Sequence, residues 1–225
     1  MLLGWSIGCA TAISLLSNAR LLGQEQHDFL SQYLTKLVLY DPPYSAFGFD
    51  SFSSKGYPLL GKTTEEHYTN FRRFVSSYFD HPKDWDGNPA KMDHRGNLEH
   101  ATCNSWTDEQ SNKIFDIKAA VRSEMPAVGG PLQTPLRDLA QRALFDEDTV
   151  NATFPDVSIV HISCRRASGT ALWGYHSMRT RYLARQANNE FVRPLSSKVI
   201  EGGNHFWHWD FPKDFLQTLA DSMRG

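Results

Sequence analysis

The sequence opens with Met1-Leu2-Leu3-Gly4-Trp5-Ser6-Ile7-Gly8-Cys9-Ala10-Thr11-Ala12, and this stretch decides the fold that we expect. It contains the pattern Gly4-x-Ser6-x-Gly8, in which a serine occupies a tight turn between a strand and a helix. Glycines on either side have no Cβ, so the backbone can turn sharply and leave the serine hydroxyl accessible. The apolar residues before the turn end a predicted strand, and residues 9–16 are expected to form the helix. Ser6 can also be an ordinary small residue in a turn, so the rest of the chain has to decide.

The composition is that of an ordinary globular protein of 225 residues. Hydrophobic residues make up 40% of the chain and charged residues 21%, and the formal net charge is -2. Because no run of Lys and Arg is present, we expect no nucleic-acid partner. No apolar stretch reaches the length of a membrane-spanning helix, so no membrane span is expected either.

Cysteine usage and the first residues bear on the cellular compartment. Cys9, Cys103 and Cys164 are too few and too irregularly spaced for a disulfide framework or a zinc site. We interpret them as small buried side chains in a reducing compartment. Residues 1–16 are apolar enough to resemble a signal peptide, but they lack Lys and Arg and polar residues interrupt the run. The expected location is the cytoplasm, with secretion as the alternative.

Strands and helices alternate along much of the chain. Residues 37–40 form a short apolar run that is typical of a buried strand, and the strand ends at Asp41-Pro42-Pro43 because proline cannot donate to a ladder. Further patterns predict a strand over 157–163, a helix over 171–188, a strand over 197–201 and an amphipathic helix over 212–223 with Phe215, Leu216 and Leu219 facing inward. This alternation predicts an α/β fold with a mainly parallel sheet flanked by helices.

Residues 48–153 interrupt the alternation with predicted helices. Thr63 with Glu66 and Thr107 with Gln110 form capping patterns, which open helices that reach about Tyr78 and Arg122. A third helix is expected from Thr134 to about Glu147, and the polar residues 80–105 are expected to form a long loop. We therefore divide the chain into a core of residues 1–47 and 154–225 and a helical insertion of residues 48–153. The insertion is either a lid over a binding site or an elaboration with no gating role.

Three polar side chains follow predicted strands and therefore fall at the edge of the sheet where ligands bind. A serine hydroxyl needs a base to take its proton, and a histidine titrates near neutrality and can take it. A carboxylate can hold the imidazole in the required tautomer. We assign Ser6 as nucleophile, His205 as general acid/base and Asp41 as the orienting carboxylate. The backbone N–H of Ile7 is expected to donate to the oxyanion, and no cofactor or metal is expected.

Other residues near these positions have competing interpretations. His208 follows His205 by three residues, and the pair could bind a metal from one side, although no carboxylate or thiolate cluster accompanies it. Packing beside Trp209 is the other interpretation of His208. His161 lies inside a predicted strand, where a histidine with satisfied hydrogen bonds is the usual case. Trp5 either binds substrate as part of an acyl pocket or fills the core.

The chain order serine, aspartate, histidine and the serine turn resemble the α/β-hydrolase superfamily. The stretches Leu39-Tyr40-Asp41-Pro42-Pro43 and Asn204-His205-Phe206-x-His208-Trp209 are similar to those of fungal α/β-hydrolase-like proteins with a helical cap. Gly202-Gly203-Asn204-His205-Phe206 resembles the histidine loop of that fold. The resemblance implies the C-terminal part of an α/β-hydrolase fold with an inserted helical cap, and a serine hydrolase that acts on small apolar ester or acyl substrates.

Two features depart from the pattern of that superfamily. Many members carry their acid after the penultimate strand, but here the loop Cys164-Arg165-Arg166-Ala167-Ser168 has no carboxylate, so Asp41 after the preceding strand takes the role. The family's sheet also has strands before the serine turn, with a loop that supplies a second oxyanion N–H. Losing one such donor typically costs on the order of 10²–10³ in rate. We therefore expect a truncated hydrolase with an open sheet edge that can self-associate. The alternative is a non-catalytic remnant that acts as a binding or interaction module.

Overall fold

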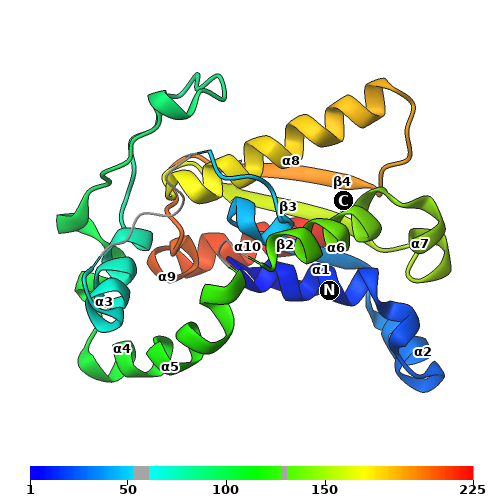
Figure 1. The fold of residues 1–225 in the computed structure, drawn as a ribbon, viewed down its shortest axis with the longest axis horizontal. Helices are drawn as coiled ribbons and strands as arrows, with labels where there is room; N and C mark the ends of the chain where they lie inside the picture. Colours follow the sequence, from blue (N-terminus) through cyan, green and yellow to red (C-terminus); the bar gives the residue numbers. More distant parts are fainter. Residues whose placement is uncertain (53–60, 128–130, 225) are drawn as a thin grey trace.

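The computed structural model describes residues 1–52, 61–127 and 131–224, and its described strands form one parallel sheet (Figure 1). The strands lie in the order β1-β2-β3-β4, with the bounds Leu2–Trp5, Lys36–Tyr40, Ser158–Cys164 and Leu195–Ile200. Strands that follow one another in sequence are therefore neighbours in the sheet, and β1 and β4 lie at its edges. The predicted α/β fold class with a parallel sheet flanked by helices is confirmed.

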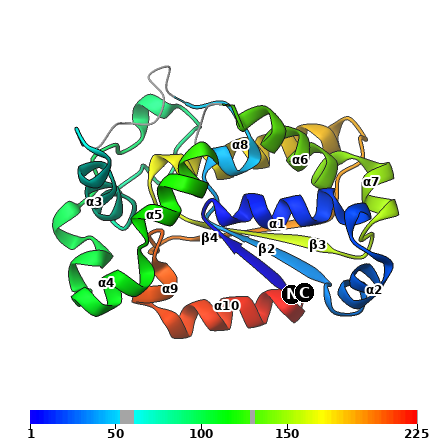
Figure 2. The same ribbon diagram turned by 60° about the horizontal axis from the view of Figure 1, so that its bottom comes forward.

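Helices cover both faces of the sheet, as Figure 2 shows. On one face lie α1 (Gly8–Ser17), α6 (Gln133–Phe145) and α8 (Gly169–Ala187), and on the other lies α10 (Pro212–Arg224). Three further helices complete this part of the chain: α2 (Gln24–Tyr33), α7 (Glu147–Ala152) and α9 (Trp207–Asp210).

Side chains of β2 alternate between two hydrophobic cores because successive residues of a strand point to opposite faces. Leu37 and Leu39 belong to the core that residues of α1 and α6 share. Val38 and Tyr40 belong to the second core, which includes Leu219 of α10. Each of the three aliphatic side chains of β2 is completely buried, which contributes about 1.5–3 kcal/mol per residue. A strand that is buried on both faces fixes the position of the residues that follow it.

The predicted inward face of the C-terminal helix is partly wrong. Leu219 is buried and Phe215 packs against the same core, but the side chain of Leu216 is 64% exposed. Phe215 and the buried Thr218 and Leu219 lie on one side of α10, and at about 100° per residue Leu216 falls roughly 100° from the middle of that side.

The segment between β2 and β3 contains α3 (Thr64–Val75), α4 (Asp108–Ile114) and α5 (Ile117–Ala119), which a π-helical turn over residues 120–124 extends. Both predicted capping boxes are present, with the Thr63 hydroxyl accepting from the Glu66 N–H and the Thr107 hydroxyl accepting from the Gln110 N–H. The two helices that these boxes open are shorter than predicted.

Two aspartates explain where the predicted helices break. Asp116 accepts from the N–H groups of Lys118 and Ala119 and starts α5, so the helix that was predicted to continue to Arg122 ends at Ile114. Asp146 accepts from the Thr149 N–H and starts α7, so the helix that was predicted to reach Glu147 ends at Phe145. Aspartate side chains compete with the helical hydrogen-bond pattern and favour caps over helix interiors.

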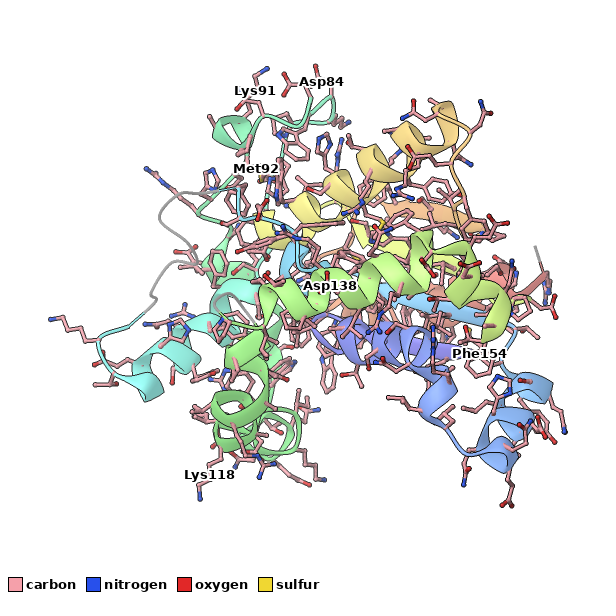
Figure 3. The ribbon with its side chains drawn as sticks, turned by 45° about the vertical axis from the view of Figure 1, so that its right-hand side comes forward. Asp84, Lys91, Met92, Lys118, Asp138 and Phe154 are labelled. Carbon is pink, nitrogen blue, oxygen red and sulfur yellow. The ribbon has the colours of Figure 1, made fainter. Side chains whose placement is uncertain are left out.

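Residues 61–127, which we call the outer segment, lie beyond the carboxyl ends of the strands (Figure 2). Short 3₁₀ turns at Pro89–Lys91, Leu98–His100 and Thr102–Ser105 interrupt the long polar loop predicted there. Figure 3 shows Asp84 and Lys91 on this loop, apart from the helical part of the segment that carries Lys118. Helices α6 and α7 follow the outer segment, and α6 packs in the core against the sheet.

A buried arginine that the sequence analysis did not single out joins the last strand to the helices. The guanidinium of Arg193 donates through Nε to the Ala143 carbonyl at 2.7 Å, and through Nη1 to the carbonyls of Phe154 at 2.6 Å and Val157 at 2.7 Å. One side chain just before β4 therefore donates to three carbonyls, one on α6 and two in the loop that leads into β3. No described helix is both long enough and apolar enough to cross a membrane.

Candidate active site

Ser6 follows directly on β1 and has a left-handed backbone with a φ of 53°. Its N–H donates to the Tyr40 carbonyl at 3.0 Å and its carbonyl accepts from the Cys9 N–H at 3.1 Å, so the turn is bonded to both β2 and α1. A Cβ on Gly4 would lie 2.8 Å from the Cys9 Cα, so the close approach of α1 to β1 requires this glycine. A Cβ on Gly8 would meet no atom within 4 Å, so the space there does not require the second glycine of the pattern.

Asp41 repeats the geometry of Ser6 on the neighbouring strand. Its φ is 49°, and its N–H donates to the Ile162 carbonyl of β3 at 2.7 Å. Because Trp5 pairs with Tyr40 in the sheet, the residues that follow them lie side by side at its carboxyl edge. Left-handed backbone costs about 1–2 kcal/mol for a residue with a Cβ. Such strain gathers at functional sites.

His205 and Asp41 form a buried hydrogen bond. The His205 Nδ1 lies 2.6 Å from the Asp41 Oδ2, and the Cys164 N–H donates to the Asp41 Oδ1 at 2.8 Å. The two side chains come from loops 164 residues apart, and both residues are almost completely buried, with exposed fractions of 1% for Asp41 and 4% for His205. An ionised carboxylate can only accept, so the Nδ1 carries the proton and Nε2 is left as an acceptor.

A cavity of about 260 Å³ brings Ser6 and His205 into one wall. Trp5 and Ile7 of the core also line the cavity, and so do residues at the start of α8. The outer segment contributes the opposite wall, which is mainly apolar and aromatic: His67, Tyr68, Phe71, Val75, Ile114, Phe115 and Glu124. Two parts of the chain that are far apart in sequence therefore enclose one space over the strand ends.

Trp5 lines this cavity and also contacts the histidine loop. Its indole N–H donates to the carbonyl of His205 at 3.1 Å, and the rings of Trp5 and His205 lie 5.2 Å apart. The Trp5 side chain therefore forms part of the cavity wall and also packs against the histidine loop and the core that contains Val38 and Tyr40.

Ile7 stands at the start of α1 and lines the same cavity. Its N–H makes no hydrogen bond to a described residue, and the start of a helix carries a partial positive charge. No hydrogen bond joins the Ser6 hydroxyl to His205 in the described part of the chain. In structures without ligand, catalytic hydrogen bonds are often long and tighten only when substrate is bound.

Two other histidines lie near the sheet: His161 is buried and His208 is half-buried. His208 contacts Trp5 and its Nδ1 lies 3.4 Å from the Tyr40 hydroxyl; burial and the neighbouring His205 lower the pKa of His208 to about 4. Burial lowers the pKa of His161 to about 3. We expected a histidine with satisfied hydrogen bonds at this position, but the buried Nε2 of His161 has no hydrogen-bond partner among the described residues. Among the described residues, no group of three His, Cys, Asp or Glu side chains is placed to hold a metal ion.

Two buried cysteines lie near the strand ends. The Cys9 thiol donates to the Gly4 carbonyl at 3.1 Å, and the Cys164 thiol lies 3.9 Å from the Tyr40 hydroxyl. Burial raises the pKa of both thiols well above the ordinary value, which disfavours the thiolate. The hydroxyl of Ser6, which is half-buried at the cavity, is the accessible candidate nucleophile.

Sequence reasoning missed two polar side chains that flank His205. Asn204 is completely buried, and Asp210 accepts hydrogen bonds from the outer segment. Their partners lie more than 100 residues earlier in the chain. In the sequence, Asn204 and Asp210 are marked only by their position close to His205, and that position does not predict what they bind.

Comparison of the chain with protein-family models and with curated proteins gives no match.

Proposed function

We propose that the protein is a serine hydrolase that cleaves ester or related acyl bonds through an acyl-enzyme. The hydrogen bond of 2.6 Å between His205 and Asp41, next to a cavity that Ser6 and His205 both line, carries this proposal. The sheet order supports it, since Ser6, Asp41 and His205 follow β1, β2 and β4 at one edge. The resemblance to the α/β-hydrolase superfamily with a helical cap assigns the same three residues to the same roles.

The chemistry divides among the three side chains as follows. The Ser6 Oγ attacks the acyl carbon while its proton passes to the His205 Nε2, and the Asp41 carboxylate stabilises the imidazolium through Nδ1. The Ile7 N–H donates to the developing oxyanion. His205 returns the proton to the leaving alkoxide, and the alcohol departs. Water then attacks the acyl-enzyme, gives its proton to Nε2, and the acid is released as Ser6 regains its hydrogen.

The cavity favours a small apolar acyl group. Phe71, Val75, Ile114 and Phe115 of the outer segment form much of the wall opposite Ser6. In this proposal the outer segment acts as a cap that excludes water from the acyl group. Ligand sites of this kind are mostly apolar with a few polar groups at the reacting end.

A second candidate function is a binding module that keeps the cavity without the chemistry. The lack of a hydrogen bond between the Ser6 hydroxyl and His205 among the described residues favours it. In that case a fatty or aromatic acid binds in the cavity equally well in the parent protein and in Ser6→Ala.

Hydrolysis of 4-nitrophenyl esters of increasing acyl length separates the two functions. We expect turnover by the parent protein, with loss of turnover in Ser6→Ala and His205→Gln. Ser168→Ala is the matched control, because it removes another hydroxyl of the same cavity and should leave turnover in place. If Ser6→Ala hydrolyses the esters as fast as the parent, the hydrolase proposal is wrong and the binding module is favoured.

The open edge of β1 also allows self-association. Among the described strands β1 pairs only with β2, so its outer edge presents unpaired backbone groups. We infer that a second copy can pair there. Light scattering across a concentration series tests this inference, and a mass that stays at that of one chain would refute it.

A further inference from the structure

We propose that the outer segment does more than form a wall of the cavity: it positions His205 through a hydrogen-bond network that is buried at Asn204 and partly buried at Asp210. The network consists of Ser76, Tyr78 and Thr102 of the outer segment and of Asn204 and Asp210 around His205. The inference rests on the proposed function, because it assigns Thr102 and Asn204 as positioning residues for the proposed base.

Asn204 is the centre of the network, and its bonds fix the amide in one orientation. Its Nδ2 donates to the Ser76 carbonyl and to the Thr102 hydroxyl, each at 2.8 Å, and its Oδ1 accepts from the Phe206 N–H at 2.9 Å. A flipped amide would place its oxygen against the Ser76 carbonyl and its NH₂ against the Phe206 N–H. Asn204, which precedes His205, is thus bonded to Ser76 at the end of α3, and Phe206, which follows His205, is bonded to Asn204.

The Thr102 hydroxyl connects Asn204 to Asp210. Its hydroxyl accepts from Asn204 and donates its single proton to the Asp210 Oδ2 at 2.7 Å. The Tyr78 hydroxyl donates to the same carboxylate oxygen. Because Asp210 ends α9, the outer segment holds both the start and the end of the stretch that carries His205.

The histidine loop begins with two glycines in different surroundings. A Cβ on Gly202 would meet no atom within 4 Å, whereas a Cβ on Gly203 would lie 3.0 Å from side-chain atoms of Ile200 and Trp207. From the core, the Trp5 indole and the Asp41 carboxylate bind His205 itself, and the Arg166 N–H donates to the Gly203 carbonyl at 2.9 Å. The outer segment adds the side-chain bonds to Asn204 and Asp210.

Removing the Thr102 hydroxyl should therefore lower the reactivity of Ser6, although Thr102 lies outside the cavity. Thr102 does not line the cavity, so substrate contacts are unchanged, whereas Asn204 loses an acceptor and Asp210 loses a donor. A displacement of a catalytic group by about 1 Å can cost on the order of 10² in rate. We expect Thr102→Val to lower the maximal rate of Ser6 labelling about tenfold or more, with the half-saturating probe concentration unchanged. Thr102→Ser keeps the hydroxyl and should stay within about twofold of the parent.

The experiment measures labelling by a fluorophosphonate over a range of probe concentrations, together with the downfield proton resonance of the His205 Nδ1–H. The resonance is assigned by its loss in His205→Gln. It should persist in the parent and in Thr102→Ser and broaden or vanish in Thr102→Val. Tyr78→Phe, which removes one hydroxyl from the same network, replaces Thr102→Val if that variant does not fold, and is expected to behave in the same direction.

The outcomes of the two measurements are distinguishable. A folded Thr102→Val with the parent's maximal labelling rate and an unchanged resonance overturns the inference, as does an effect confined to the half-saturating concentration. If the parent is not labelled at Ser6, the proposed function fails. The resonance then decides the positioning role alone: loss in Thr102→Val supports it, and no change overturns it.

Discussion

Replacing Asp41 by asparagine tests the orientation of His205 with almost no change of shape. Asp41 is 1% exposed, and each carboxylate oxygen has its own partner, since Oδ1 accepts from the Cys164 N–H at 2.8 Å and Oδ2 binds the His205 Nδ1 at 2.6 Å. In Asp41→Asn the amide oxygen must stay on the Cys164 N–H, because the NH₂ group would place a donor against a donor. The NH₂ then faces the His205 Nδ1, which must become an acceptor.

The forced tautomer carries its proton on Nε2 and cannot take the proton of Ser6. The same exchange in a serine protease triad slows the reaction by about 10⁴. At about 1.36 kcal/mol for each factor of ten, this corresponds to about 5.4 kcal/mol of the activation barrier. The free energy of unfolding should fall by much less, on the order of 1–3 kcal/mol, because only one buried bond changes.

The assay compares second-order rate constants for fluorophosphonate labelling of the parent and Asp41→Asn near neutral pH, with Ser6→Ala as the unlabelled control. Thermal unfolding of each variant shows that the fold is retained. A folded Asp41→Asn that is labelled as fast as the parent would refute the role of Asp41.

Three further predictions concern stability. Gly4→Ala should lower the free energy of unfolding by about 1–3 kcal/mol, since the new Cβ would meet the backbone of Cys9, whereas Gly8→Ala should not lower it. Urea unfolding measures both variants, and equal effects would contradict the close approach of α1 to β1 at Gly4. Burial lowers the pKa of His161 to about 3, so the unfolded chain binds the extra proton and stability is lost as pH falls from about 6.5 toward 3. His161→Leu should make this loss shallower, and an unchanged pH slope would contradict it. Arg193→Met should lower the free energy of unfolding by about 2 kcal/mol or more, because the carbonyls of Ala143 and Val157 lose their donor at about 1–3 kcal/mol each, while the Phe154 carbonyl keeps only the Val157 N–H. A change in melting temperature within error would contradict this prediction.

Local sequence signals predicted the elements that depend on local chemistry. The strand that ends at Asp41, the capping boxes at Thr63 and Thr107, and the turn at Ser6 are all present. Each needs only an apolar run, a cap or a breaker within a few residues. The same reasoning placed Asp41 and His205 at strand ends, and the sheet brings them together because parallel strands end at one edge.

Other features of the fold and the site depended on competition between alternative hydrogen bonds, or on contacts between residues far apart in the sequence. Asp116 and Asp146 end helices because their side chains bind the N–H groups of the next helix, and from sequence each could also sit within a longer helix. Asn204 binds Ser76 and Thr102 at separations of 128 and 102 residues, and only the folded chain reveals those partners. Arg193 is buried against carbonyls, which have no signature in sequence at all.

Mass spectrometry of the folded protein after treatment with a fluorophosphonate tests the central claim most directly. We predict an adduct on the peptide that contains Ser6, which is absent in Ser6→Ala and in the parent protein unfolded before treatment. A folded protein without an adduct on Ser6, or with equal labelling in Ser6→Ala, would contradict the assignment of Ser6 as the nucleophile.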